Sequence, residues 1–183
     1  LHVIVDSRFT SSKNGVKASV LSFVPLNDNC EISQLTLTNG SSEDKKLSVF
    51  SYVEWCLWNA DDDIKNFQRN LSTGEVEVQD STIYHKTEYR ERRNHYAIYS
   101  VNTKIDGFDT SRDAFLGAYR GADSPEAVEN GKCTNSMASG WSPIASHQIN
   151  VDLAAGETKT FIFVLGYIEN PEDEKWESYG VIN

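Results

Sequence analysis

Basic residues are scarce in this chain of 183 residues. It has 17 lysines and arginines against 27 aspartates and glutamates, which gives a net charge of -10. Nucleic acids and anionic membrane surfaces are bound mainly through basic patches. The composition therefore argues against both as the main partner and favours a neutral ligand.

Cysteine and long apolar runs are also scarce. The chain has 3 cysteines, Cys30, Cys56 and Cys133, and none of them forms a C-x-x-C pair, so we expect neither a disulfide framework nor a zinc site. No apolar run approaches the roughly 20 residues that a membrane-spanning helix needs, and no signal-peptide pattern is present. We expect a soluble protein in the reducing cytoplasm.

The usual patterns of catalytic centres are missing as well. The four histidines (His2, His85, His95 and His147) share no metal-ligand spacing, and no G-x-S-x-G motif occurs. The triple acid Asp61 to Asp63 is typical of a solvated turn or helix start. We therefore expect no metal and no catalytic residue in this chain.

What the chain does have is a series of short β-like segments separated by turn residues. Their alternating or continuous apolar patterns, rich in β-branched and aromatic residues, predict strands joined in an antiparallel sandwich. The predicted strands cover residues 16–24, 30–38, 47–53, 75–78, 81–84, 96–101, 146–153 and 158–167. The fold class is therefore predicted to be all-β.

The pattern weakens between residues 102 and 145, where we expect an elaborated loop region. Asp123 and Ser124 followed by Pro125 predict one or two helical turns over residues 125–129, with the proline in the first helical position. The charged run after Asn170 indicates an exit from the sandwich. We expect residues 1–170 to be part of the sandwich domain, residues 171–183 to lead toward linker helices, and the whole chain to belong to a longer polypeptide.

The most informative segment runs from Tyr52 to Asn70, because it is too rich in tryptophan, asparagine and arginine for ordinary core. Aromatic faces beside amides and a guanidinium suit a sugar, whose C–H face stacks on rings while its hydroxyls bind polar groups. In strand geometry Trp55 and Trp58 lie on opposite faces. One tryptophan can then pack in the core while the other faces a cleft, although both could simply cover the core.

A second segment, Tyr84 to Tyr96, combines four basic side chains with two acids. Arginine binds carboxylates bidentately, so internal or interface pairing is the favoured interpretation. Phosphate binding is the alternative, but no glycine-rich loop accompanies these cations.

Several long motifs resemble the N-terminal domain of cellobiose phosphorylases, which are inverting disaccharide phosphorylases of glycoside hydrolase family 94. The motifs are residues 52–60, 66–70, 84–97, 106–109 and 140–145. The resemblance implies a large galactose-mutarotase-like super-sandwich, followed in the full protein by linker helices and a helical barrel. It also implies a glycosyltransferase reaction without a cofactor, in which inorganic phosphate is the co-substrate.

In such enzymes phosphate attacks the anomeric carbon of cellobiose and releases α-glucose 1-phosphate and glucose. The resemblance places the catalytic acid in the helical barrel, so this chain alone is expected to be inactive. It further implies a homodimer, and a sandwich loop that covers the acceptor side of the active site. Carried over by position, the substrate-binding candidates are Asn59, Asn66, Phe67, Gln68 and Arg69.

Two other functions are compatible with the residues. One is a stand-alone carbohydrate-binding sandwich, and the other is a structural dimerisation module. Within the family, enzymes acting on cellodextrin, chitobiose or laminaribiose are further alternatives, because no residue of the chain fixes the sugar.

Overall fold

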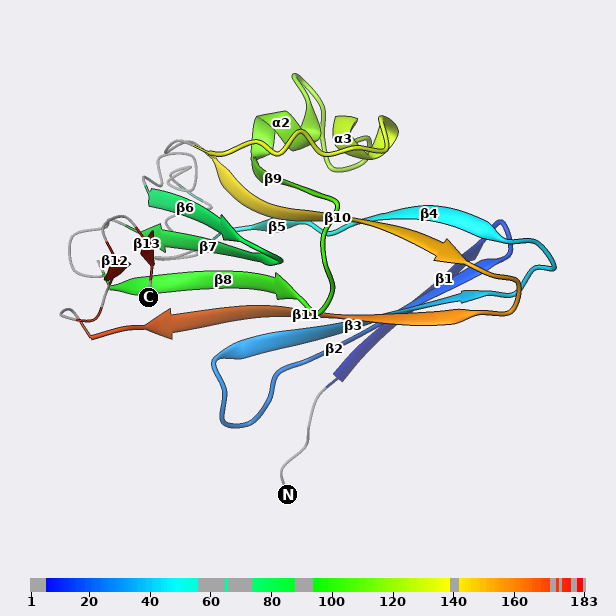
Figure 1. The fold of residues 1–183 in the computed structure, drawn as a ribbon, viewed down its shortest axis with the longest axis horizontal. Helices are drawn as coiled ribbons and strands as arrows, with labels where there is room; N and C mark the ends of the chain where they lie inside the picture. Colours follow the sequence, from blue (N-terminus) through cyan, green and yellow to red (C-terminus); the bar gives the residue numbers. More distant parts are fainter. Residues whose placement is uncertain are drawn as a thin grey trace.

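The chain folds into two antiparallel β-sheets that pack face to face, as shown by a computed structural model (Figure 1). The structure describes residues 6–55, 65, 74–87, 94–138, 142–171, 174, 176–178 and 181–182. The elements in chain order are β1 (Asp6–Lys13), β2 (Val16–Phe23), β3 (Cys30–Asn39), β4 (Lys45–Phe50), β5 (Val53–Glu54), β6 (Gly74–Gln79), β7 (Thr82–Thr87), β8 (His95–Val101), β9 (Gly107–Ser111), α2 (Arg112–Leu116), α3 (Glu126–Glu129), β10 (Pro143–Leu153), β11 (Thr158–Glu169), β12 (Trp176–Ser178) and β13 (Val181–Ile182).

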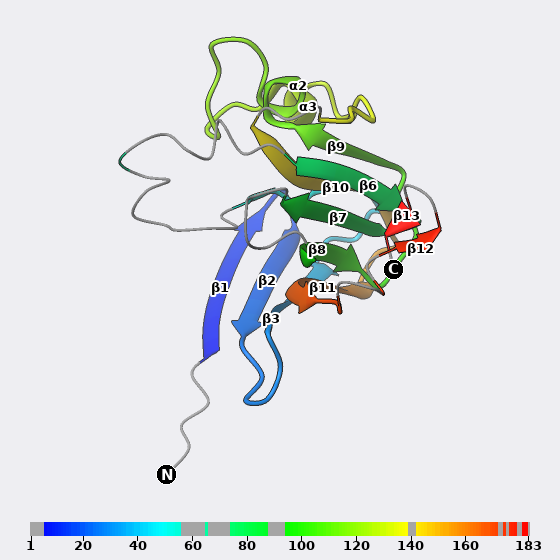
Figure 2. The same ribbon diagram turned by 90° about the vertical axis from the view of Figure 1, so that its left-hand side faces the viewer.

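The larger sheet has seven strands in the order β1-β2-β3-β11-β8-β7-β6. In the smaller sheet β10 pairs with β4, β5 and β9, and β12 and β13 form a separate hairpin. The strand direction turns strongly between β1 and β6, which is the usual twist of an antiparallel sheet (Figure 2). The predicted all-β sandwich is confirmed.

The main core lies between β10 and the middle of the larger sheet. Inward-facing residues of both sheets form one buried cluster because alternate residues of each strand point to this layer. Its members are Leu37, Trp55, Ile83, Ala97, Tyr99, Val101, Ala145, Ile149, Val151, Leu153, Phe161 and Phe163.

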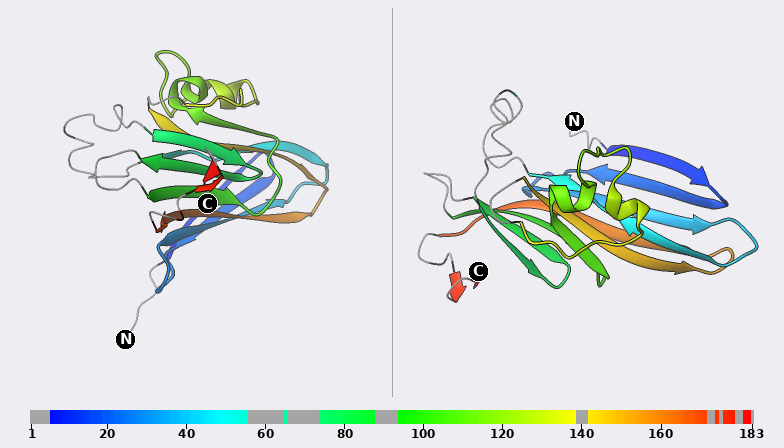
Figure 3. Two further views of the ribbon diagram at one scale, coloured as in Figure 1. Left: turned by 60° about the vertical axis from the view of Figure 1, so that its left-hand side comes forward. Right: turned by 90° about the horizontal axis from the view of Figure 1, so that it is seen from above.

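The first half of β10 is buried on both faces. Ala145 and Ile149 face the larger sheet, whereas Ile144 packs in a second cluster with Phe115, Leu116, Ala127 and Cys133. Figure 3 shows α2 and α3 lying over β10, and these helices supply much of that second cluster. In the second half of β10, Asn150 and Asp152 are exposed. Here the strand regains the alternating pattern of a sheet with one wet face.

The predicted strands all exist, with shifted ends. One of them, 47–53, is divided into β4 and β5 because the side chain of Ser51 intervenes. Its Oγ accepts the backbone N–H of His147 at 2.9 Å, in the place of a ladder carbonyl. Asn14 and Gly15 join β1 to β2 with φ values of 52° and 81°, which are typical of a two-residue hairpin turn.

The region expected to be an elaborated loop contains more structure than the sequence indicated. β9 and α2 lie within it and were not predicted, because each has only 5 residues and no clear period. The predicted helical turn is found as α3, but it begins at Glu126. Pro125 is the N-cap and Ser124 makes no capping bond; its hydroxyl donates to Glu129 instead.

Two further differences concern the ends of the chain. β1 was not predicted because its sequence is dominated by serine, threonine and charged residues, and all eight of its residues are exposed. The segment beyond Asn170 contains the β12–β13 hairpin where linker or helix was expected. Within the described part of the chain, no helix is long and apolar enough to cross a membrane.

Two fully buried histidines lie inside the sandwich. His85 stands against Trp55 with 5.7 Å between ring centroids, and His147 stacks on Tyr99 at 4.9 Å. Burial lowers the pKa of each imidazole to about 4. Among the described residues, neither nitrogen of His85 has a hydrogen-bond partner, and Nε2 of His147 lacks one too.

These histidines predict loss of stability in mild acid. Between pH 6.5 and about 4 the unfolded state binds protons that the folded state does not, so the free energy of unfolding falls as the pH falls. Each histidine contributes on the order of 3 kcal/mol over that range. We expect the double substitution His85→Phe and His147→Phe to make the free energy of unfolding, measured with urea, change less between pH 5 and 6.5. If this free energy changes with pH as steeply in the variant as in the unaltered protein, the prediction is wrong.

Candidate functional site

The predicted sugar-binding segment joins the two sheets at one end of the sandwich. It leaves from β5 in the smaller sheet and returns at β6, the edge of the larger one. Its candidates Asn59, Asn66, Phe67, Gln68 and Arg69 lie outside the described residues. Their role therefore stays a prediction, and the geometry of the site begins at the base of the segment.

Trp55 at this base belongs to the core. It is 6% exposed and packs against His85. A core position for Trp55 agrees both with the interpretation in which Trp58 faces a cleft and with the one in which both tryptophans cover the core. The indole Nε1 of Trp55 is buried and finds no hydrogen-bond partner in the part of the chain that the structure describes. Trp58 lies outside the described residues, which leaves the cleft-facing alternative as a prediction.

A hydrogen-bonded group next to Trp55 ties the smaller sheet to α2. The carboxylate of Glu54 accepts the Tyr52 hydroxyl at 2.6 Å and the Arg112 Nε–H at 3.0 Å. Burial, and then the bond to Glu54, raises the pKa of Tyr52, while Glu54 raises the pKa of Arg112. Tyr52 also stacks on Phe115 of α2, with ring centroids 5.1 Å apart. The start of the predicted loop is thus held by β10 through strand pairing and by α2 through Arg112 and Phe115.

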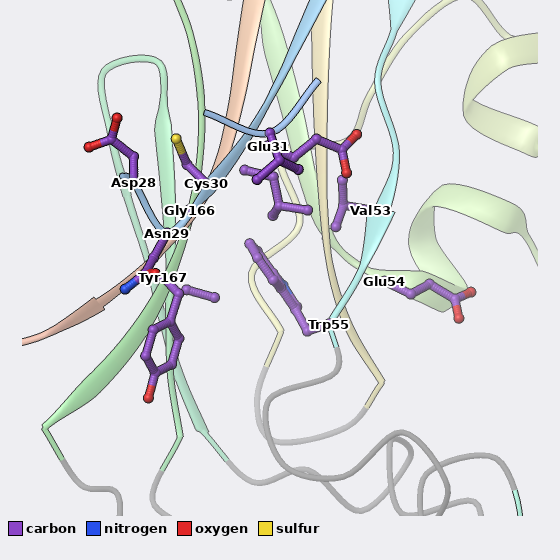
Figure 4. A pocket seen from close by; sticks show the side chains of 12 residues that line it. Asp28, Asn29, Cys30, Glu31, Val53, Glu54, Trp55, Gly166 and Tyr167 are labelled. Carbon is purple, nitrogen blue, oxygen red and sulfur yellow. The ribbon is translucent and has the colours of Figure 1, made fainter. Parts of the chain in front are cut away.

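An open cavity of about 490 Å³ lies beside Trp55, between the two sheets. Figure 4 shows Trp55 in its middle, with Glu31, Glu54 and Tyr167 placed around it. Its walls come from the β2–β3 turn, β3, β5, β8 and β11; they are Val24, Asp28, Asn29, Cys30, Glu31, Val53, Glu54, Trp55, Ala97, Leu165, Gly166 and Tyr167. The Glu54 carboxylate points away from Trp55 toward α2 (Figure 4), so Glu31, Asp28, Asn29 and the aromatic rings supply the polar and apolar groups of the space.

The second segment singled out in the sequence is partly inside the protein. His85 and Lys86 on β7 are fully buried, so they do not belong to an exposed basic surface. The three arginines of this segment and its acids Glu88 and Glu91 lie outside the described residues, and both the pairing and the phosphate interpretation remain predictions. Among described residues, no three His, Cys, Asp or Glu side chains gather in a group that could hold a metal ion.

A buried acid from the motif 106–109, which was not among the predicted site residues, organises residues 133–136 after α3. Asp109 on β9 is 0% exposed, and its Oδ1 accepts hydrogen bonds from the backbone and hydroxyl of Thr134 and of Ser136, at 2.6–3.1 Å. Burial and the charge of Asp109 raise the pKa of the neighbouring Cys133 thiol to about 12. The hydroxyl residues at positions 134 and 136 were the only sequence sign of this arrangement.

Substitution Asp109→Asn should release this segment. The amide turns Oδ2, which accepts the Thr134 backbone N–H at 3.2 Å, into a donor and removes the charge that strengthens the bonds to Oδ1, so we expect a loss of about 1–3 kcal/mol of stability. Cys133, 1% exposed, should then react with a thiol reagent in the folded protein. The matched control is Asp106→Asn, whose parent carboxylate accepts one backbone N–H, that of Asn150. Equal thiol reactivity in the two variants would contradict the assignment.

The fold and the site define the class of the protein: an antiparallel β-sandwich with a polar and aromatic cavity at the end of β5. Among solved structures, it is similar to a GalM/aldose epimerase homologue from C. elegans, with a TM-score of 0.52 at 10% identity over 93% of this chain and 68% of the other. That likeness confirms the galactose-mutarotase-like fold.

Residues 2–178 match the family described as glycosyl hydrolase 94, supersandwich domain, and the chain belongs to this family. It is 30% identical over 166 residues to an N,N'-diacetylchitobiose phosphorylase from Vibrio proteolyticus, covering 90% of this chain and 21% of that protein. It is 27% identical to a solabiose phosphorylase from Paenibacillus borealis, covering 93% of this chain and 22% of that one. The chain thus spans about a fifth of the length of these relatives.

Proposed function

We propose that this chain is part of the supersandwich domain of an inverting disaccharide phosphorylase. The observation that carries the proposal is the family match over residues 2–178, together with relatives that are phosphorylases. The reaction would transfer a glycosyl group from a disaccharide to inorganic phosphate. A phosphate oxygen forms a bond to the anomeric carbon, the glycosidic bond breaks, and an acid outside this chain protonates the departing oxygen.

In this proposal the chain supplies the acceptor side of the active site and not its chemistry. The segment with Asn59, Asn66, Phe67, Gln68 and Arg69 would hold the departing sugar, the amides and guanidinium by hydrogen bonds and Phe67 by apolar contact. Its base is suited to positioning a loop because Glu54 is bonded to both Tyr52 and Arg112. We also propose that the complete protein is a cytoplasmic homodimer in which a helical barrel carries the catalytic acid.

Cellobiose is our first candidate substrate, based on the motifs of the sequence. N,N'-diacetylchitobiose is the second, and the identity of 30% to a phosphorylase for that sugar favours it. Incubating the complete polypeptide with phosphate and each disaccharide in turn decides between them. We expect one of the two to yield a sugar 1-phosphate of α configuration. Absence of any sugar phosphate with both disaccharides would contradict the proposal.

The acceptor role is tested by Asn66→Ala and Gln68→Ala in the complete enzyme. A lost hydrogen bond of about 1–2 kcal/mol corresponds to roughly a tenfold weaker interaction. In the synthetic direction we expect the KM for the acceptor sugar to rise about tenfold and the KM for the sugar 1-phosphate to stay the same. The control is Asn130→Ala, an exposed asparagine at the end of α3. Unchanged acceptor kinetics in both loop variants would rule out the role.

A further inference from the structure

The cavity beside Trp55 is one end of a longer groove on the inner face of the larger sheet. A second hollow, of about 310 Å³, is lined by residues of β1 and β2. The two hollows share Val24 and Glu31 as lining residues, so they join at the start of β3. The groove therefore runs from Phe9 on β1 to Trp55 and Tyr167.

The strand register shows which side chains form its floor. Ser7 lies opposite Ser22, and Ser22 lies opposite Ser33, so these three serines share one face of the sheet. Glu31 lies two residues before Ser33 on β3 and therefore points to the same face. The hydroxyl oxygens of Ser22 and Ser33 are 2.6 Å apart, and the Ser33 hydroxyl donates to the Glu31 carboxylate at 3.5 Å. At this end the inner face is a row of hydroxyls and a carboxylate.

Aromatic side chains stand at both ends of this polar row. Phe9 is 67% exposed, although the register places it on the same face as the buried layer. At the other end, Trp55 lines the cavity while its buried Nε1–H lacks an acceptor among the described residues. An isolated exposed aromatic residue is common, but a buried donor without a partner is costly.

The charges of the groove select the ligand. Among the described residues that line the two hollows, none is Lys, Arg or His, and three are carboxylates, at Asp28, Glu31 and Glu54. Glu54 already binds Arg112 and Tyr52, which leaves Glu31 and Asp28 as the accessible acids. Phosphates and other anions are disfavoured in such a site. Vicinal hydroxyl groups suit it, because a carboxylate accepts two hydrogen bonds side by side.

We propose that this groove is a binding site for a neutral oligosaccharide, separate from the predicted loop site at residues 59–69. Glu31 and Asn29 would bind hydroxyl groups, and Tyr167 and the edge of Trp55 would contact the apolar faces of the sugar rings. The distance from β1 across β2 and β3 to β11 is about 14 Å at ordinary strand spacing, and Tyr167 lies about 20 Å further along β11 than Phe161, the residue in register with Phe9. A short oligosaccharide therefore fills the part of the groove between Glu31 and Tyr167 and not its whole length. The claim depends neither on phosphorolysis nor on the loop.

The test is a titration of the complete polypeptide, labelled with 5-fluorotryptophan, with cellotriose and with triacetylchitotriose in phosphate-free buffer. The fluorine signal of Trp55 is identified by its loss in Trp55→Phe. We expect this signal to shift in a saturable manner with at least one of the sugars. The substitution Glu31→Gln changes an exposed side chain and should weaken the binding about three- to tenfold. The control Asp152→Asn, an exposed acid on β10, should leave it unchanged.

The same spectra separate this inference from the proposed function, since Trp58 belongs to the loop. A shift of Trp55 without a shift of Trp58 supports the groove and counts against the loop. A shift of Trp58 alone, or of neither residue, overturns the groove. The inference is also overturned if the Trp55 signal reports the same sugar affinity in the unaltered protein, in Glu31→Gln and in Tyr167→Ala, because the sugar would then bind elsewhere.

Discussion

The packing of β10 against the middle of the larger sheet is the interaction on which the rest of the structure depends. Ile149, Val151 and Leu153 enter the layer formed with Phe161 and Phe163 of β11. The same strand pairs with β4, β5 and β9, so it also determines the positions of the elements beside it. Burial of these side chains supplies most of the stabilisation, because apolar area removed from water is the main favourable contribution to folding.

The position of the site follows from this arrangement. β5 is held by two residue pairs with β10, and the chain leaves it at Trp55, which closes the core against His85. On the other face of β10, the helices bring Arg112 to Glu54. The loop that we assign to acceptor binding therefore starts from a base fixed by the core below and by an ion pair beside it. Such a rigid base favours precise positioning of polar groups.

The sequence predicted the sandwich well where each strand carried its own apolar pattern. β2, β3, β8 and β11 are of this kind, and their ends were shifted by only a few residues. β1 was missed because Ser7, Ser11 and Ser12 carry no hydrophobic signal, and its strand structure depends on pairing with β2. The division of 47–53 into two strands occurs at Ser51, which is hydrogen-bonded through its backbone and its side chain to His147, 96 residues away.

The site could be predicted only in part for the same reason. Composition predicts a sugar-binding role for the segment from Tyr52 to Asn70, and this role stays a prediction, whereas family membership is confirmed. The cavity was not visible, because Glu31, Trp55 and Tyr167 come from three distant segments that only the fold brings together. Asp109 was missed for a similar reason, since its partners Thr134 and Ser136 lie 25 and 27 residues away.

The central claim is that the segment between β5 and β6 binds the acceptor sugar of a disaccharide phosphorylase. The most direct measurement is an experimental structure of the complete polypeptide with the disaccharide bound. The account predicts that the acceptor sugar lies within hydrogen-bond distance of at least one of Asn59, Asn66, Gln68 and Arg69. A bound disaccharide that contacts no residue between 56 and 73 would contradict it.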